Sequence, residues 1–260
     1  MNGVDGVRAA IASVDGIRAA ATGLIGVAAA AEQVLLAEAA LAPTAMPGSP
    51  QRWAALPVIA HNTDFRRQQV QRLRAVRCSQ APPEFGEVDH SSAALYAELR
   101  AQPADAVGRD SWRVAGELAE EMRLVSQEDL LEPARNPWLR GRQLWLQVVV
   151  RGFWHPAGHL GEYYLRHEQA DRAVALAEHA VATADYLSAP AAARGMAAYN
   201  LACAQAGAGF LDAAAAALTA AVGLNPDVRA NALRDSDLTA LRDSGRLAAL
   251  SDSPDSGGAS

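Results

Sequence analysis

Residues Trp154–Tyr164, with the sequence WHPAGHLGEYY, lie where two different sequence patterns meet. The stretch contains two of the six histidines, His155 and His159, at positions i and i+4. Side chains with this spacing share one face of a helix, so both imidazoles can point toward one metal ion. Zinc-binding helices use the same arrangement. The stretch therefore predicts half of a metal site, which needs a further ligand from another part of the chain.

Upstream of this stretch, the chain is expected to form four main helices joined by loops that contain proline and glycine. Alanine is very abundant while β-branched and aromatic residues are sparse, which favours helix over strand. Ligands that project from facing helices into a shared core give the layout of a four-helix-bundle metal site. The predicted fold class is all-α, with main helices at 22–41, 50–76, 103–126 and from 138 into the histidine stretch, and a short helix at 93–100.

Three prolines and one tryptophan have a predicted role within these helices. Pro50 is expected at the first position of the second helix, and Pro57 is expected to kink it. Pro156 is expected to kink the fourth helix because it lacks a backbone N–H. Apolar spacing places Trp112 on the inward face of the third helix, whereas the acidic residues Glu117, Glu120 and Glu121 are assigned to solvent.

The two ends of the chain are predicted to lie outside the folded core. Residues 1–20 contain the sequence VDGVRAA and its near copy VDGIRAA, and we interpret them as a low-complexity lead-in. Residues 251–260 are rich in Ser, Asp and Gly and are expected to be disordered.

Composition excludes several classes of function. The net charge of −6 argues against a general nucleic-acid-binding or membrane-binding surface. All basic residues are arginine, which excludes a Schiff-base lysine and a Walker lysine. Cys78 and Cys203 are far apart and form no CxxC motif, so they are expected to be reduced thiols.

No targeting or membrane segment is expected. The N-terminus lacks the basic segment and apolar core of a signal peptide. The most apolar run, residues 24–42, is interrupted by Glu32, Gln33 and Glu38 and is not expected to span a membrane. The predicted location is the cytoplasm.

From Leu160 onward, small and large residues recur at the positions of a tetratricopeptide (TPR) repeat, whose period is about 34 residues. The first copy has Leu160, Gly161, Tyr164, Ala173, Ala177 and Ala180 at these positions, and the second has Leu201, Ala202, Ala214, Leu218, Ala221 and Pro226. Residues 155–250 therefore resemble a short TPR-like tail of helical hairpins that shares the last bundle helix.

Residues 21–168 resemble the DinB/YfiT-like superfamily, which includes mycothiol-dependent maleylpyruvate isomerases and bacillithiol transferases. The resemblance rests on His155-x(3)-His159 and on an upstream motif, Trp53-x(6)-Ala60-His61-Asn62-x-Asp64-Phe65. It implies a DinB-like four-helix bundle and a divalent metal, zinc or nickel, held by His61, His155 and His159. Three neutral imidazoles with an open fourth position also suit a catalytic zinc site on chemical grounds.

The function implied by the resemblance is that of a thiol-dependent transferase or isomerase, or a hydrolase. The nucleophile would be a metal-bound thiolate or hydroxide that attacks a small-molecule electrophile. Mycothiol or another low-molecular-weight thiol would be the second cofactor. The alternative is a non-catalytic interaction module, in which a degenerate bundle supports a TPR tail that binds a peptide or protein. A homodimer is possible in either case.

Four further residues are candidates for roles near the metal. Asp64 follows His61 by about one helical turn and could orient it or contact substrate, and we assign it a catalytic role. Asn62 and Arg66 are candidates for binding the thiol cofactor. Glu162 is assigned a catalytic role, with three readings left open: a third metal ligand in place of His61, a partner of a ligand histidine, or a helix-surface acid.

Overall fold

The computed structural model describes residues 13–39, 54–85 and 102–247. The described residues are helical with no strand, which confirms the all-α prediction. Three predictions lie outside the described residues: the short helix at 93–100, the position of Pro50 and the tail at 251–260.

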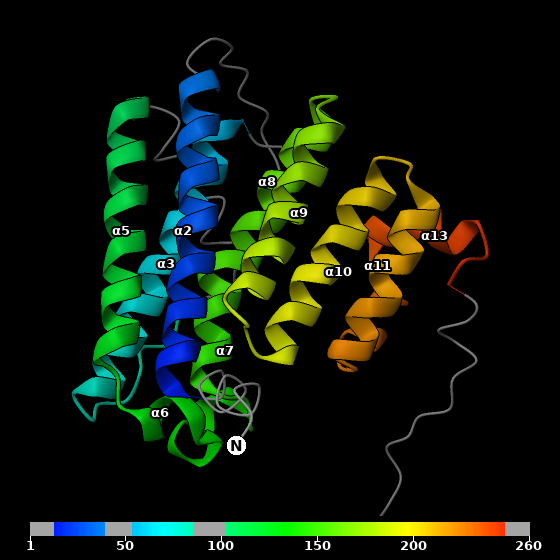
Figure 1. Cartoon of the computed structure of the whole chain (residues 1–260). Coiled ribbons are helices and arrows are strands. Elements are labelled where there is room, and N and C mark those ends of the chain that lie inside the picture. The colour runs from blue at the N-terminus through cyan, green and yellow to red at the C-terminus, as the bar shows by residue number, and fades with distance from the viewer. Residues whose placement is uncertain (1–12, 40–53, 86–101, 248–260) are drawn as a thin grey trace, which may run out of the picture.

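Three long helices pack together at one end of the molecule (Figure 1). These are α2 (Val14–Ala39), α3 (Ala55–Arg77) and α5 (Ala104–Leu124). A broken fourth segment packs against them, formed by α7 (Leu144–Val149), the π-helical turn η4 (Val150–Trp154) and α8 (His155–Arg166).

The remaining long helices follow one another across the molecule from α8 (Figure 1). They are α9 (Ala170–Tyr186), α10 (Ala191–Gly207) and α11 (Leu211–Leu224). Helix α9 packs against both α2 and α8, so the C-terminal helices and the N-terminal ones share a core. The chain continues through α12 (Val228–Ala232), η5 (Ser236–Leu238) and α13 (Thr239–Asp243).

The expected uninterrupted helix from residue 138 is wrong. Between α5 and α7 the chain forms α6 (Gln127–Leu131) and two 3₁₀ turns, η2 (Pro133–Arg135) and η3 (Pro137–Leu139). Arg140 and Gly141 then adopt positive φ angles of 53° and 86°, which no right-handed helix accommodates. Helix α7 therefore begins only at Leu144.

Two helix boundaries also differ from expectation. Helix α2 begins at Val14, and Ile17 and Ala20 are buried in the core, so this part of the predicted lead-in belongs to the fold. Helix α3 begins at Ala55 and runs continuously to Arg77. Pro57 therefore lies in its first turn, where a missing N–H leaves no helical hydrogen bond unmade and causes no break.

The core is built from hydrophobic side chains of α2, α5 and the fourth segment, including Leu24, Leu118, Val148 and Phe153. Burial of each such side chain contributes about 1.5–3 kcal/mol. Helix α2 is long and apolar enough to pass a length-and-hydropathy test for a membrane span, at residues Val14–Glu38. Half of its most apolar window is buried inside the molecule.

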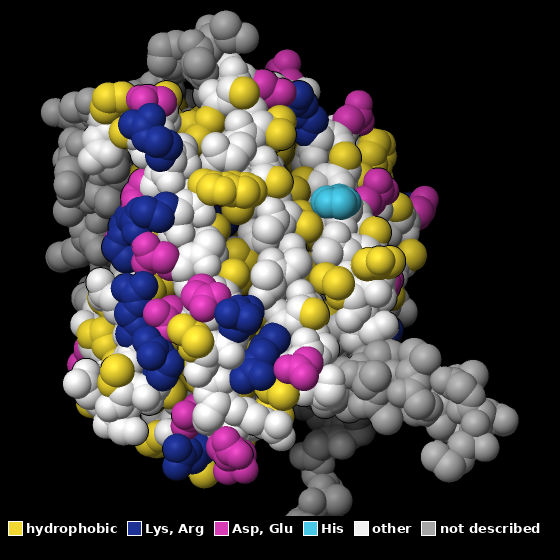
Figure 2. Space-filling model, turned by 60° about the vertical axis from the view of Figure 1, so that its left-hand side comes forward, with side chains coloured by type: hydrophobic (Ala, Val, Ile, Leu, Met, Phe, Trp, Pro, Cys, Tyr) yellow, Lys and Arg dark blue, Asp and Glu magenta, His cyan; other side chains and the backbone are white. Residues whose placement is uncertain are grey.

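The prediction that Trp112 faces inward is wrong, because its side chain is 55% exposed. Ser111, one residue earlier and about 100° around the helix, is fully buried instead. Glu121, which was assigned to solvent, is buried and accepts hydrogen bonds from Arg74 at 2.8 Å and Arg77 at 3.3 Å. Ion pairs of this kind join α3 to α5, and basic and acidic side chains are interspersed on the face shown in Figure 2.

Candidate metal centre

The π-helical turn η4 immediately precedes His155 and connects α8 to α7. In a regular α-helix, the N–H of residue 156 would donate to the carbonyl oxygen of Gly152. Pro156 has no N–H, so this carbonyl lacks its usual helical donor. Arg66 of α3 donates a hydrogen bond from Nε to this carbonyl at 3.3 Å. A π-turn occupies the five residues before His155, on the N-terminal side of Pro156, and the expected kink stays a prediction.

Gly152 also allows η4 to approach α2 and α5 closely. A Cβ atom at this position would lie 2.6 Å from Cγ1 of Ile25 and 3.1 Å from Cδ2 of Leu118. Both atoms belong to packed core side chains, so only glycine fits without movement of the core. The position of the histidine helix thus depends on a residue without a side chain.

Three imidazoles converge between α3 and α8. The Nε2 atoms of His61 and His155 are 3.0 Å apart, and the His159 ring centroid lies 5.0 Å from that of His61 and 4.4 Å from that of His155. One possible ligand atom from each histidine lies within 4.8 Å of the others. Two nitrogens bound to one tetrahedral zinc at about 2.0–2.1 Å would lie about 3.3 Å apart. The three histidines can therefore hold a metal ion.

Burial keeps two of these imidazoles neutral. His61 is 1% exposed, and its burial, followed by the charges of His159 and Arg151, lowers its pKa to about 3. Burial likewise lowers the pKa of His155 well below its ordinary value. Neutral imidazoles have a lone pair available for a metal, so no proton has to be displaced from these two residues at neutral pH.

His159 is the third member of the group, and its two ring nitrogens differ in their contacts. Its Nδ1 atom lies 3.4 Å from Oε2 of Glu162, one turn later on α8. Its Nε2 atom is buried without a hydrogen-bond partner, as expected of a nitrogen reserved for a metal. Of the three readings of Glu162, the geometry supports a carboxylate that contacts a ligand histidine, with His61 as the third possible ligand.

Aromatic packing covers the group on its α3 side. The ring of Phe65 stacks on His155 with centroids 4.1 Å apart and lies 4.6 Å from His61. The guanidinium of Arg151 in turn covers the Phe65 ring at 4.4 Å. This packing restricts the orientation of two imidazoles and excludes water from one side of them.

Asn62 and Arg66 lie in a buried polar network, so the structure does not present them to a cofactor. Both are fully buried. Glu32 of α2 accepts from Nδ2 of Asn62 at 3.1 Å and from Nη1 of Arg66 at 2.7 Å. It also accepts from the hydroxyl of Ser111 on α5 at 2.5 Å. The network ties three helices together behind the histidines.

Asp64 is directed away from the network and the histidines. Its carboxylate accepts from Nε2 of Gln68 at 2.8 Å and from Arg67 at 3.5 Å, both on its own helix. Sequence reasoning also missed the roles of Glu32 and Ser111, although an acid in the middle of a largely apolar helix was a signal that could have identified Glu32.

No protein-family model matches the chain, and the searches of curated proteins and of solved structures found no match either. The DinB-like and TPR-like assignments therefore remain predictions that rest on the motifs themselves.

Proposed function

We propose that this chain is a divalent-metal-dependent enzyme that acts on a small electrophilic molecule. The observation that carries the proposal is the convergence of His61, His155 and His159 from two helices, with ligand atoms within 4.8 Å of one another. Two of the three are held neutral by burial, and the Nε2 atom of the third is buried without a partner. This combination matches the needs of a metal better than those of a structural hydrogen-bond network.

The metal proposed is zinc or nickel, because both bind imidazole nitrogens well. Three neutral ligands leave the positive charge of such an ion uncompensated, so it would lower the pKa of a water or thiol in the open position. A low-molecular-weight thiol such as mycothiol is the second proposed cofactor, on the strength of the motif resemblance. The reaction class is thiol transfer or isomerisation, with hydrolysis as the outcome if water takes the place of the thiol.

The residues around the histidines have positioning roles in this proposal. Glu162 accepts from Nδ1 of His159, which fixes the tautomer and leaves Nε2 for the metal. Phe65 keeps water from one side of His155. Asn62 and Arg66, first considered for thiol binding, hold α3 against α2 through Glu32.

Metal analysis of protein prepared without a polyhistidine tag tests the proposal. We expect His61→Ala and His155→Ala each to lose about one bound zinc or nickel ion per chain relative to the unmodified protein. His179→Ala, which changes an exposed histidine, is the matched control and should leave the metal content unchanged. Identical metal content in all three variants would overturn the proposal.

Activity is measured on a small electrophile with and without added thiol. Mass analysis of the product then distinguishes thiol addition from hydrolysis. The proposal expects that the reaction is lost in His155→Ala and retained in His179→Ala. Equal rates in these two variants would contradict a role of the centre in catalysis.

A further inference from the structure

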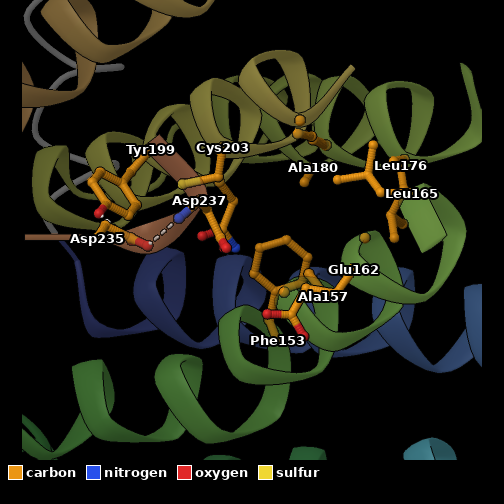
Figure 3. Close-up of a pocket in the computed structure, with 17 residues that line it drawn as sticks. Phe153, Ala157, Glu162, Leu165, Leu176, Ala180, Tyr199, Cys203, Asp235 and Asp237 are labelled. Atoms are coloured by element: carbon orange, nitrogen blue, oxygen red, sulfur yellow. Dashed lines mark hydrogen bonds between the residues drawn. The ribbon is translucent and has the colours of Figure 1, made fainter. Parts of the chain in front are cut away.

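A second group of possible metal ligands lines a cavity on another side of α8. The cavity has a volume of about 160 Å³ and lies between α8, α9 and α10 (Figure 3). Apolar side chains, including Phe153, Leu165 and Leu176, form one part of its wall. Polar side chains gather in another part of the wall, where Cys203, Asp235 and Asp237 come together.

The three polar residues come from two elements that are distant in sequence. Cys203 projects from α10, whereas Asp235 and Asp237 belong to the turn that begins η5. One possible ligand atom from each lies within 4.8 Å of the others. Asp235 is held in place by the hydroxyl of Tyr199, which donates to it at 2.5 Å, and by the backbone N–H of Asp237 at 3.0 Å.

The carboxylates of this group lie close to one another, and the charge of Arg166 offsets their mutual repulsion only in part. Nearby, Arg194 forms an ion pair with Asp185, and Arg246 forms one with Asp212. No ion pair found in the described part of the chain includes Asp235 or Asp237. Burial and the carboxylates of Asp235 and Glu162 raise the pKa of Asp237 to about 6. Burial and the two aspartates likewise raise the pKa of the Cys203 thiol well above its ordinary value. A bound dication would reverse this unfavourable balance.

We propose that Cys203, Asp235 and Asp237 form a second divalent-cation site, distinct from the three histidines and favouring zinc over magnesium and calcium. Zinc accepts a thiolate together with carboxylate oxygens, whereas magnesium and calcium bind oxygen ligands. Binding deprotonates the thiol, so a zinc–sulfur bond forms and one proton passes to solvent. The adjoining cavity leaves room for a water or a small ligand beside the ion.

Helical geometry explains how one helix serves both sites. His155 and His159 lie within about 40° of each other around α8, and Ala157, Gly161 and Leu165, which line the cavity, lie on another face. Glu162 falls between the two faces. Its carboxylate contacts His159 and also lines the cavity, so it lies within electrostatic reach of both groups.

Cobalt(II) added to the metal-free protein is the probe, because a thiolate bound to cobalt gives a charge-transfer absorption band in the near ultraviolet. Three imidazoles cannot produce this band. We expect the band in the unmodified protein, its loss in Cys203→Ser, and at least a tenfold weaker cobalt affinity in Asp237→Asn. Asp237→Asn keeps the size of the side chain, so this variant tests the site even if Cys203→Ser fails to fold.

Two control variants separate this site from the other thiol and from the histidines. Cys78→Ser, which changes an exposed cysteine, should retain the band. His155→Ala should also retain it, and zinc analysis should give about two ions per chain in the unmodified protein and about one in either His155→Ala or Cys203→Ser.

The proposal is overturned if the unmodified protein gives no band, or if the band is lost with Cys78 or His155 rather than with Cys203. If the proposal about the histidine centre is wrong, the result differs. His155→Ala would then leave the metal content unchanged, and the cobalt–thiolate band would still be present. The two proposals can therefore fail independently.

Discussion

Arg66 and Gly152 are joined by a hydrogen bond of 3.3 Å from the arginine Nε to the glycine carbonyl oxygen. This hydrogen bond satisfies the carbonyl oxygen that receives no helical hydrogen bond from Pro156, because proline has no backbone N–H. The same guanidinium donates to Glu32 at 2.7 Å, and both side chains are fully buried. One buried cation thus connects α2, α3 and the π-turn that precedes His155.

Removing one member of this buried pair should strongly destabilise the protein. We expect Glu32→Gln or Arg66→Met to lower the free energy of unfolding by about 3–5 kcal/mol, because each leaves an uncompensated or unsatisfied group in the core. Urea denaturation followed by circular dichroism measures the change. Arg109→Met, which breaks an exposed pair with Asp105, should change it far less, because solvent screens that pair. Equal effects at the two pairs would contradict this account.

Gly152→Ala should affect both stability and metal binding. The added methyl group would meet Ile25 and Leu118, so we expect a loss of about 1–3 kcal/mol in the free energy of unfolding and weaker zinc affinity. Gly158→Ala is the matched control on α8, because its Cβ would meet nothing within 4 Å. That change should leave stability equal or raise it by up to about 1 kcal/mol. Thermal unfolding measures the stability and zinc titration measures the affinity. If Gly152→Ala has unchanged stability and unchanged zinc affinity, the close approach of η4 to α2 and α5 is unimportant.

Glu162→Gln should weaken zinc binding by the histidine centre by about 10–100-fold. The amide removes the negative charge that faces Nδ1 of His159 while it keeps the size of the side chain. Competition with a zinc chelator measures the affinity, and a background with Cys203→Ser confines the readout to the histidines. Glu178→Gln changes an exposed acid and serves as the control. Equal affinities in the two variants would refute a supporting role for Glu162.

The metal-free protein should lose stability as the pH falls below neutrality. Burial holds the pKa of His61 near 3 in the folded chain, against an ordinary value of 6.5. Between these values the unfolded chain binds a proton that the folded chain does not, so the free energy of unfolding decreases with decreasing pH. The contribution of this residue is at most about 1.4 kcal/mol per pH unit.

Urea denaturation in the presence of a chelator at pH 7, 6 and 5 measures this slope. His61→Gln should reduce it, whereas His179→Asn, at an exposed position, should leave it unchanged. A metal-free protein that is equally stable at pH 5 and pH 7 would show that His61 is not held neutral by burial.

The helical class and the three histidines were predictable because they depend on local features of the sequence. Alanine content favours helix, and the i and i+4 spacing determines that His155 and His159 share a face. The pairing of His61 with them was reached from a motif, and the structure brings the three together. These predictions required no knowledge of which atoms touch across the core.

The errors arise where packing overrides a local pattern. Trp112 was assigned to the core from the spacing of apolar residues. The phase of α5 instead directs Ser111 inward, where its hydroxyl donates to Glu32. Arg66 was a candidate for binding the thiol cofactor because it lies near His61 in the sequence, but its partners lie on other helices. Neither contact can be read from spacing along one helix.

The π-turn at residues 150–154 has a consequence for how this centre can arise or disappear during evolution. A π-turn amounts to one residue inserted into an α-helix, and its removal would rotate everything that follows by about 100°. His155 and His159 would then leave the face of α8 that meets His61, although neither would have mutated. A related chain could therefore retain all three histidines and still lack the centre through a single-codon deletion, so segment length is as informative as residue identity when relatives are sought.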